Sequence, residues 1–252
     1  MSIPENSAFG GTLTVMRREL AGYFSTPVAW VFIVIFLVMA GTFTFYIGSF
    51  YERGMADLVP FFQFHAWLYL FLVPAIAMRL WAEERRAGTV ELLLTLPLTT
   101  GQAVFGKFLA AWLFIGLALL LTFPVWITVN YLGNPDNGII TAGYIGSWLM
   151  AGGFLAIGSC MSAITRNQVV AFILSVVVCF GFMLSGLPMV MNLFTGWAPQ
   201  ALIDTIANFS FLAHFTAVSK GVIDFRDLVY FGLVIVFWLM ANMVVIEMKK
   251  AD

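Results

Sequence analysis

The sequence alternates between long runs of uncharged, mainly apolar residues and short charged segments. The first run lies between Glu19 and Glu52 and holds 32 uncharged residues, and each of the five later runs holds at least 19. Because the hydrocarbon core of a bilayer is about 30 Å thick, a helix needs about 20 apolar residues to cross it. The pattern therefore predicts six spanning helices, at about residues 28–50, 58–81, 103–131, 141–164, 168–194 and 228–246.

Composition narrows the class of protein. Of the 252 residues, 62% are hydrophobic and 10% are charged, whereas a soluble domain carries about 25% charged residues. A soluble enzyme and a disordered chain are therefore excluded, and the net charge of −1 argues against a nucleic-acid partner. The apolar runs lack the alternation of barrel strands, so the spans must be helices. We expect an all-α integral membrane protein that forms a single domain over residues 1–252.

The basic residues predict the orientation, because cytoplasmic segments carry the excess of Lys and Arg. With six spans both termini lie on one side, and nine of the 12 basic residues fall on that side. Only Arg53, Lys220 and Arg226 fall on the other. We therefore expect both termini in the cytoplasm. Pro74, Pro124 and Pro188 are each expected to bend a span.

Two segments outside the spans also carry a pattern. Residues 12–26 predict an amphipathic helix in the cytoplasmic interface, because their apolar side chains cover an arc of about 100°; the residues of this interfacial helix are Leu13, Met16, Arg17, Arg18, Leu20, Tyr23 and Phe24. A frayed basic tail is the alternative. Residues 195–226 are broken by Gly196 and Pro199 and predict re-entrant or interfacial helices on the outer side.

Residues that could support catalysis or metal binding are few. His65, His214, Cys160 and Cys179 have no metal-ligand spacing, and the two cysteines are expected to behave as small hydrophobic residues. Ser185 with His214 leaves a membrane-embedded hydrolase as a remote alternative, although the glycine that should precede such a serine is Met183. We expect no catalytic residue, no metal and no cofactor in this chain.

Residues 101–107 match the Gly and Lys positions of a phosphate-binding loop. Phe108 stands where a Ser or Thr should hold Mg²⁺, and no strand precedes the segment. Thr99 and Gln102 instead predict a capping box at the start of the third span. Lys107 is then expected to extend towards the cytoplasmic headgroups.

The most distinctive segment lies between spans two and three, at residues 83–101. Span two is predicted to continue through the charged residues 83–86 and to end at Gly88. Thr89 can cap a short helix that carries Glu91 in its first turn, presents Val90, Leu93 and Leu94 on one face and ends at Pro97. Physical reasoning leaves two interpretations open: a helix that docks into a cytoplasmic partner, or charges that only anchor the topology.

This segment resembles the region after the second span in ABC-2 type transporter permeases, and the chain is most similar to the gliding-motility-associated permease subfamily. The residues that carry the resemblance are Glu83, Glu84, Gly88, Thr89, residues 91–94, Pro97, Gly106 and Lys107. Further resemblance is found in residues 18–20, 23–27, 132–135 and 165–168.

The resemblance implies the permease subunit of an exporter in the bacterial inner membrane. Two copies, as a homodimer, would pair with cytoplasmic ATPase subunits that bind ATP and Mg²⁺, and a separate extracytoplasmic subunit is a further implied partner. The implied ATPase-coupling interface comprises Glu83, Glu84, Arg85, Arg86, Gly88, Thr89, Glu91, Leu93, Leu94 and Pro97, with a second contact at Arg166 and Asn167. A membrane anchor for an ATPase-regulated surface complex is the alternative function. No residue indicates the substrate.

Overall fold

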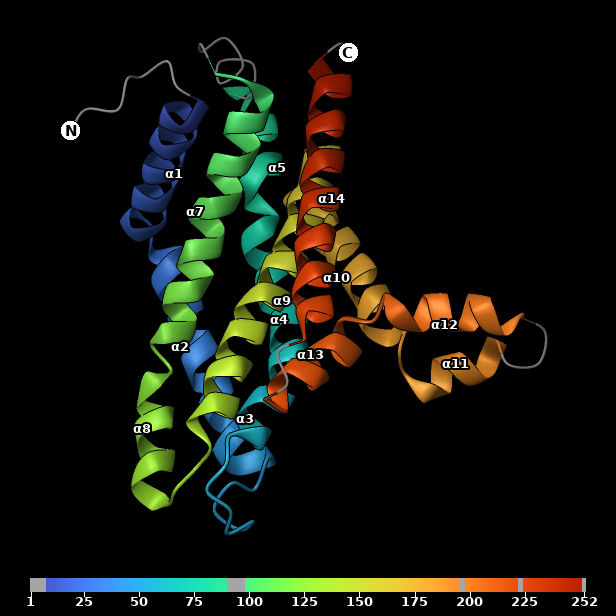
Figure 1. The fold of residues 1–252 in the computed structure, drawn as a ribbon. Coiled ribbons are helices and arrows are strands. Elements are labelled where there is room, and N and C mark those ends of the chain that lie inside the picture. The colour runs from blue at the N-terminus through green and yellow to red at the C-terminus, as the bar shows by residue number, and fades with distance from the viewer. Residues whose placement is uncertain (1–7, 90–97, 195–197, 222–223, 251–252) are drawn as a thin grey trace.

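The computed structural model describes residues 8–89, 98–194, 198–221 and 224–250, and Figure 1 shows its fold. The regular structure of these residues is entirely helical, as the sequence predicts. The elements are α1 (Ala8–Ser25), α2 (Pro27–Thr42), the π-helix η1 (Phe43–Ile47), α3 (Val59–Gln63), α4 (His65–Ala77), α5 (Arg79–Ala87), α7 (Thr100–Leu120), α8 (Phe123–Leu132), α9 (Asn137–Ile164), α10 (Gln168–Leu184), α11 (Pro188–Phe194), α12 (Gln200–Asn208), α13 (Phe211–Ser219) and α14 (Phe225–Lys250).

Five helical segments of the described chain are long and apolar enough to cross a membrane. A sixth crossing is obtained if α12 and α13, which are bent by 61° relative to each other, count as one span. α1 begins and α14 ends at the same end of the bundle, where α5 ends and α7 begins (Figure 1). This arrangement agrees with an even number of crossings, and the side that faces the cytoplasm stays a prediction.

The fifth predicted span, residues 168–194, is not one continuous helix. α10 ends at Leu184 after 17 residues, and α11 begins at Pro188, so a turn interrupts the apolar run. At this turn Gly186 lies against Ser210, whose Oγ would stand 2.4 Å from a Cβ on that glycine. Apolar composition alone hid the break, because a short turn of small residues does not lower the hydropathy of the run.

The third predicted span is also interrupted. α7 ends at Leu120, and α8 begins at Phe123. Pro124 lies in the first turn of α8, where proline is tolerated because the first N–H groups of a helix have no partners within it. The helix is thus interrupted just before Pro124, although Thr100–Leu132 as a whole still counts as one candidate span; the predicted bend stays a prediction. Pro74 differs, because α4 continues past it to Ala77.

α9 is the central helix of the bundle and contacts α4, α5, α7, α10, α13 and α14. Every residue from Met150 to Ala163 is buried. Glycines let its neighbours approach closely: a Cβ on Gly158 would stand 2.4 Å from the Cβ of Ala77 in α4, and one on Gly152 would stand 2.8 Å from the indole nitrogen of Trp112 in α7. Small residues serve this purpose in membranes, where packing rather than water expulsion brings helices together.

α1 lies beside α7 along much of its length (Figure 1). At the closest approach, Val15 is buried against Gly106, and a Cβ on that glycine would stand 2.7 Å from the Cβ of Val15. α1 therefore uses part of its apolar surface to pack on the bundle. Its location in the membrane interface stays a prediction.

Replacing Gly106 by alanine tests this packing. The added methyl group should push α1 away from α7 and lower the free energy of unfolding by about 1–3 kcal/mol. Gly22→Ala in α1 is the matched control, because nothing lies within 4 Å of its Cβ position and alanine is favoured there by about 0.5–1 kcal/mol. Denaturation in detergent micelles, followed by circular dichroism, measures both. Equal stability of the two variants would contradict the close contact.

Candidate functional site

The candidate site is built around α5, the helix that precedes the predicted coupling segment. α5 ends at Gly88, which adopts the left-handed conformation with φ 71°, as the sequence predicts for a helix end. The Thr89 hydroxyl donates a hydrogen bond to the carbonyl of Glu84, 3.3 Å away, and so closes the helix behind it. Glu83, Arg86, Gly88 and Thr89 are exposed. The predicted residues Glu91, Leu93, Leu94 and Pro97 lie outside the described residues.

A buried lysine joins three helices at this end of the bundle. The Nζ atom of Lys107 in α7 lies 2.7 Å from Oε1 of Glu84 in α5 and 3.1 Å from Oε1 of Glu19 in α1. The Lys107 side chain is only 2% exposed, and Nζ also lies 5.4 Å from the centre of a Trp81 ring. The expectation that Lys107 extends towards headgroups is therefore wrong: two carboxylates neutralise it inside the protein, which removes the cost of burying a lone charge.

Arg18 extends the same cluster on its exposed side. Its guanidinium lies 2.8 Å from Glu19 and 4.0 Å from Glu84. Burial by itself raises the pKa of Glu19, but the charges of Lys107 and Arg18 outweigh this effect, and the pKa lies below its ordinary value of 4.5. The carboxylate of Glu19 therefore binds a proton at higher pH in the unfolded chain than in the folded protein. Its contribution to the free energy of unfolding is complete above the ordinary pKa and is lost as the pH falls through the lowered pKa of the folded protein.

α5 is fastened to α9 by a serine. Ser162 Oγ donates to the carbonyl of Met78, 2.9 Å away, and accepts the backbone N–H groups of Trp81 at 3.1 Å and Ala82 at 3.0 Å. These N–H groups belong to the first turn of α5, where a helix has no internal partners for them. Ser162 therefore caps α5 from the neighbouring helix.

A second serine continues this connection to the last helix. Ser159 Oγ accepts the indole N–H of Trp81 at 3.2 Å and the side-chain amide of Asn242 in α14 at 2.7 Å. Ser159 and Asn242 are fully buried. Sequence reasoning missed this chain of contacts, although two signals were present: serines three residues apart in a Gly-rich span, and a single asparagine amid the apolar residues of the last span.

The structure brings the two predicted coupling regions together. The guanidinium of Arg85 donates to the carbonyl of Ala163 at the end of α9, and Arg85 is close enough to Arg166 for their charges to repel. Asn167 caps α10 by accepting the backbone N–H of Val169 at 2.9 Å. Arg166 and Asn167 are both exposed. Their surface therefore adjoins the exposed end of α5.

The predicted interfacial residues also reach this region. Leu13, Met16 and Leu20 are half-buried, whereas Arg17 and Arg18 are exposed. Farther along α1, the Tyr23 ring stacks on Phe114 of α7 with 5.1 Å between the ring centres, and Phe24 meets the same ring edge-on at 5.8 Å. The apolar face predicted for lipid is thus partly occupied by α7.

The residues of the hydrolase alternative make their hydrogen bonds elsewhere. Ser185 donates to the carbonyl of Phe182, and the ring of His214 bonds Asp227 and the carbonyl of Asn208. His65 is fully buried and bonds the carbonyl of Phe61. Among the described residues, no group of three or more His, Cys, Asp or Glu side chains is placed to hold a metal ion. The described geometry thus gives the hydrolase no support.

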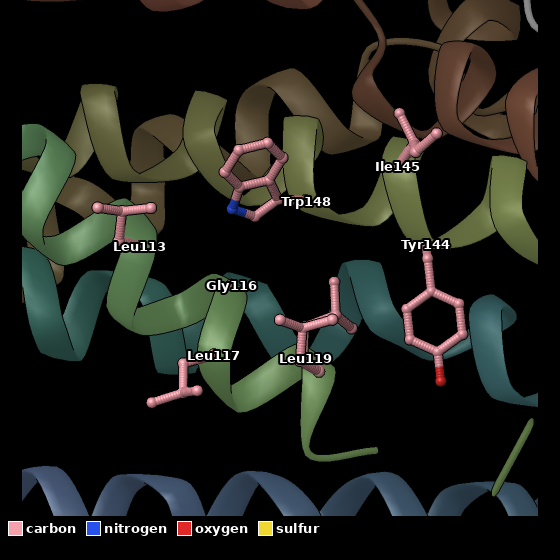
Figure 2. A pocket seen from close by; sticks show the side chains of 8 residues that line it. Leu113, Gly116, Leu117, Leu119, Tyr144, Ile145 and Trp148 are labelled. Carbon is pink, nitrogen blue, oxygen red and sulfur yellow. The ribbon is translucent and has the colours of Figure 1, made fainter. Parts of the chain in front are cut away.

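A groove of about 410 Å³ lies between α7 and α9 (Figure 2). Its lining is hydrocarbon from Leu113, Gly116, Leu117, Leu119, Leu120, Tyr144, Ile145 and Trp148. The polar atoms of its two aromatic residues are already bonded, since the Tyr144 hydroxyl pairs with Thr122 and the Trp148 indole donates to the carbonyl of Trp112. The groove therefore offers no polar recognition and does not extend the candidate site.

Removing the lysine tests the buried cluster. Lys107→Met leaves Glu19 and Glu84 without their shared cation, and the free energy of unfolding should fall by about 3 kcal/mol. Adding Glu19→Gln and Glu84→Gln should recover most of this loss, because no buried charge then remains unpaired. The control is Arg53→Met, which breaks a half-exposed pair with Asp57 and should cost less than about 1 kcal/mol. A loss no greater than that of the control would contradict the buried cluster.

Ser162→Ala tests the attachment of α5 to α9. The variant removes the partner of two N–H groups in the first turn, so the free energy of unfolding should fall by about 1–2 kcal/mol. Ser175→Ala is the matched control, since this buried serine bonds only a carbonyl of its own helix. Chemical denaturation in micelles separates the two, and an equal loss would show that the bridge between helices adds nothing.

Comparison with known proteins is consistent with this arrangement. No curated protein matches the chain. The sequence model of the family described as ABC-2 family transporter protein matches residues 13–225, which include α1 from Leu13 onward, the described part of the coupling region and the helices through α13. The match covers most of the 252 residues. The chain therefore belongs to the ABC-2 family of transporter proteins.

Proposed function

We propose that this chain is the permease subunit of an ATP-driven exporter. Two copies would enclose the translocation pathway as a homodimer, and separate cytoplasmic ATPase subunits would bind ATP and Mg²⁺. Family membership supports the permease role, because ABC-2 permeases generally pair with a cytoplasmic ATPase. On this proposal the protein lies in the bacterial inner membrane with both termini in the cytoplasm, and its likeness to the gliding-motility subfamily is part of the same proposal.

The observation that carries the proposal is the attachment of α5. Its exposed end leads directly into the predicted coupling segment, while its body is bonded on two sides. Glu84 connects it through Lys107 to α7 and α1, and Ser162 connects it to α9. A force applied beyond Gly88 would therefore reach three other helices instead of bending α5 alone.

The hydrogen bonds of α5 indicate which helices would move with it. Closure of an ATPase pair would displace the coupling segment, and α5 would carry the displacement to the Ser162 and Ser159 side of α9. Because Ser159 is shared by Trp81 and Asn242, α14 would move with α9. The exposed surface at Arg166 and Asn167 adjoins α5 and would form the second ATPase contact.

The charges inside the spans support an external source of energy. Among the described residues, the buried Lys, Arg, Asp and Glu side chains are Lys107 and Asp227. Both are paired, the lysine with two carboxylates and the aspartate with His214. Ion-driven carriers place ionisable groups where a moving ion can reach them. Here Lys107 holds α1, α5 and α7 together, and Asp227 lies in the first turn of α14, at the end of that helix.

Charge reversal at Arg86 tests the coupling surface. Arg86 is exposed at the end of α5, so Arg86→Glu should leave the fold intact and weaken binding of the partner ATPase subunit by about tenfold or more, since like charges at an interface are costly. The measurement is co-purification of the two proteins in detergent, together with the ATPase activity that the permease stimulates.

Lys220→Glu is the matched control, because Lys220 is exposed and directly follows α13, a helix that lies well away from α5 (Figure 1). It should leave ATPase binding and stimulation unchanged. If Arg86→Glu and Gly88→Val both retained ATPase binding and stimulation at the level of the control, the coupling surface would lie elsewhere. Stimulated hydrolysis without movement of any cargo would instead favour the anchoring role.

A further inference from the structure

The turn between α12 and α13 is fastened to α14 by a histidine. His214 in α13 places Nδ1 at 2.6 Å from Oδ1 of Asp227 and Nε2 at 3.0 Å from the carbonyl oxygen of Asn208, the last residue of α12. The His214 and Asp227 side chains are 11% and 8% exposed. His214 thus connects the helices on both sides of it in the sequence.

The partners determine how many protons this arrangement holds. A carbonyl oxygen can only accept, so Nε2 of His214 must carry a proton and donate it to Asn208. The other contact joins Nδ1 to a carboxylate, and it also needs a proton between the two atoms. Both contacts are therefore made only when two protons are shared by the pair, one on Nε2 and one between Nδ1 and the carboxylate. A neutral histidine beside an ionised aspartate has only one of these protons.

An aromatic ring and a hydrogen-bonded turn surround the pair. The His214 ring stacks on Tyr230 with 3.9 Å between the ring centres, and an aromatic face attracts a cation. The guanidinium of Arg226 donates to the side chain of Asn208, the backbone N–H of Arg226 is accepted by Asp224, and the Tyr230 hydroxyl donates to the carbonyl of Phe209.

The other helices packed on α13 present apolar or small groups in their described contacts. Gly146 of α9 lies against Phe215 and Val218 of α13, and Gly153 of α9 lies against Phe211. Gly186, in the turn that follows α10, lies against Ser210. The nearest acid in α12, Asp204, is bonded to Gln200 of the same helix. The charged groups at the His214 site are therefore Asp227, Asp224 and Arg226.

We propose that His214 and Asp227 form a proton-binding site that holds the lateral arm of the permease against the bundle. The lateral arm is the part formed by α11 and α12, described at residues 188–194 and 198–208, which projects sideways from the other helices (Figure 1). The ligand is a single proton from the predicted extracytoplasmic side. This inference concerns the isolated chain and does not depend on the proposed export function.

Release of the proton breaks one of the two contacts. If Nε2 gives its proton to water, its lone pair faces the carbonyl of Asn208 and the end of α12 is repelled. If Nδ1 gives it up instead, the lone pair faces the Asp227 carboxylate. In either case the histidine becomes neutral and one hydrogen bond is lost, so the connection from Asn208 through His214 to Asp227 is broken. Among the described side-chain contacts, the end of α12 is then tied to α14 by Arg226 and Tyr230.

The test is hydrogen exchange of the α12 amides in the purified permease, reconstituted in lipid nanodiscs, at roughly pH 5 and roughly pH 9, on either side of the range in which histidine titrates. After correction for the intrinsic rate, wild-type protection in residues 200–210 should fall by about tenfold or more at the higher pH, the effect of losing a charge-assisted hydrogen bond. His214→Gln, which cannot bridge both acceptors, should show the low protection at both values.

Asp227→Asn is the decisive variant. Its amide N–H can donate to Nδ1 of a neutral histidine, which leaves Nε2–H for Asn208, so protection should stay high at both pH values. The control is Asp204→Asn, an exposed carboxylate of α12, which should keep the wild-type pH dependence. Equal protection of the wild type at the two pH values, or pH dependence retained in Asp227→Asn, would overturn the proposal.

Discussion

The burial of one ammonium group between two carboxylates determines how this end of the bundle is assembled. Lys107, Glu19 and Glu84 come from three different helices, and the ammonium group of Lys107, whose side chain is 2% exposed, could not be buried there without the two carboxylates. α1 is consequently held to the bundle at a fixed height, and α5 cannot rotate without separating Glu84 from its cation. The position of α5 depends on this interaction together with its hydrogen bonds to Ser162.

Much of the fold could be predicted from local patterns in the sequence. Thr99 and Gln102 form the expected capping box, in which each side chain bonds the backbone of the other residue. Gly88 ends α5 in the expected conformation, and Pro124 starts α8 as a first-turn proline. These features depend on residues close in sequence. The turn at Gly186 depends on a contact with Ser210, 24 positions away, and so the end of α10 was misplaced.

The candidate site was predictable only in part, and for a related reason. The exposed residues Glu83, Arg86, Arg166 and Asn167 follow from charge and turn patterns. Sequence spacing does not reveal that Lys107 turns inward, because a lysine near a helix end can equally well reach the headgroups. Ser159, Ser162 and Asn242 act only through partners on other helices, so their role appears once α5, α9 and α14 are packed together.

The early end of α10 has a consequence for the surrounding lipid. Its 17 residues rise about 25 Å at 1.5 Å each, less than the roughly 30 Å of a hydrocarbon core, whereas the 28 residues of α9 rise about 42 Å. Bilayer beside a short apolar wall must thin or be covered by other protein. On the side that carries α10, the bilayer is therefore expected either to thin locally or to be replaced by a contact with another protein.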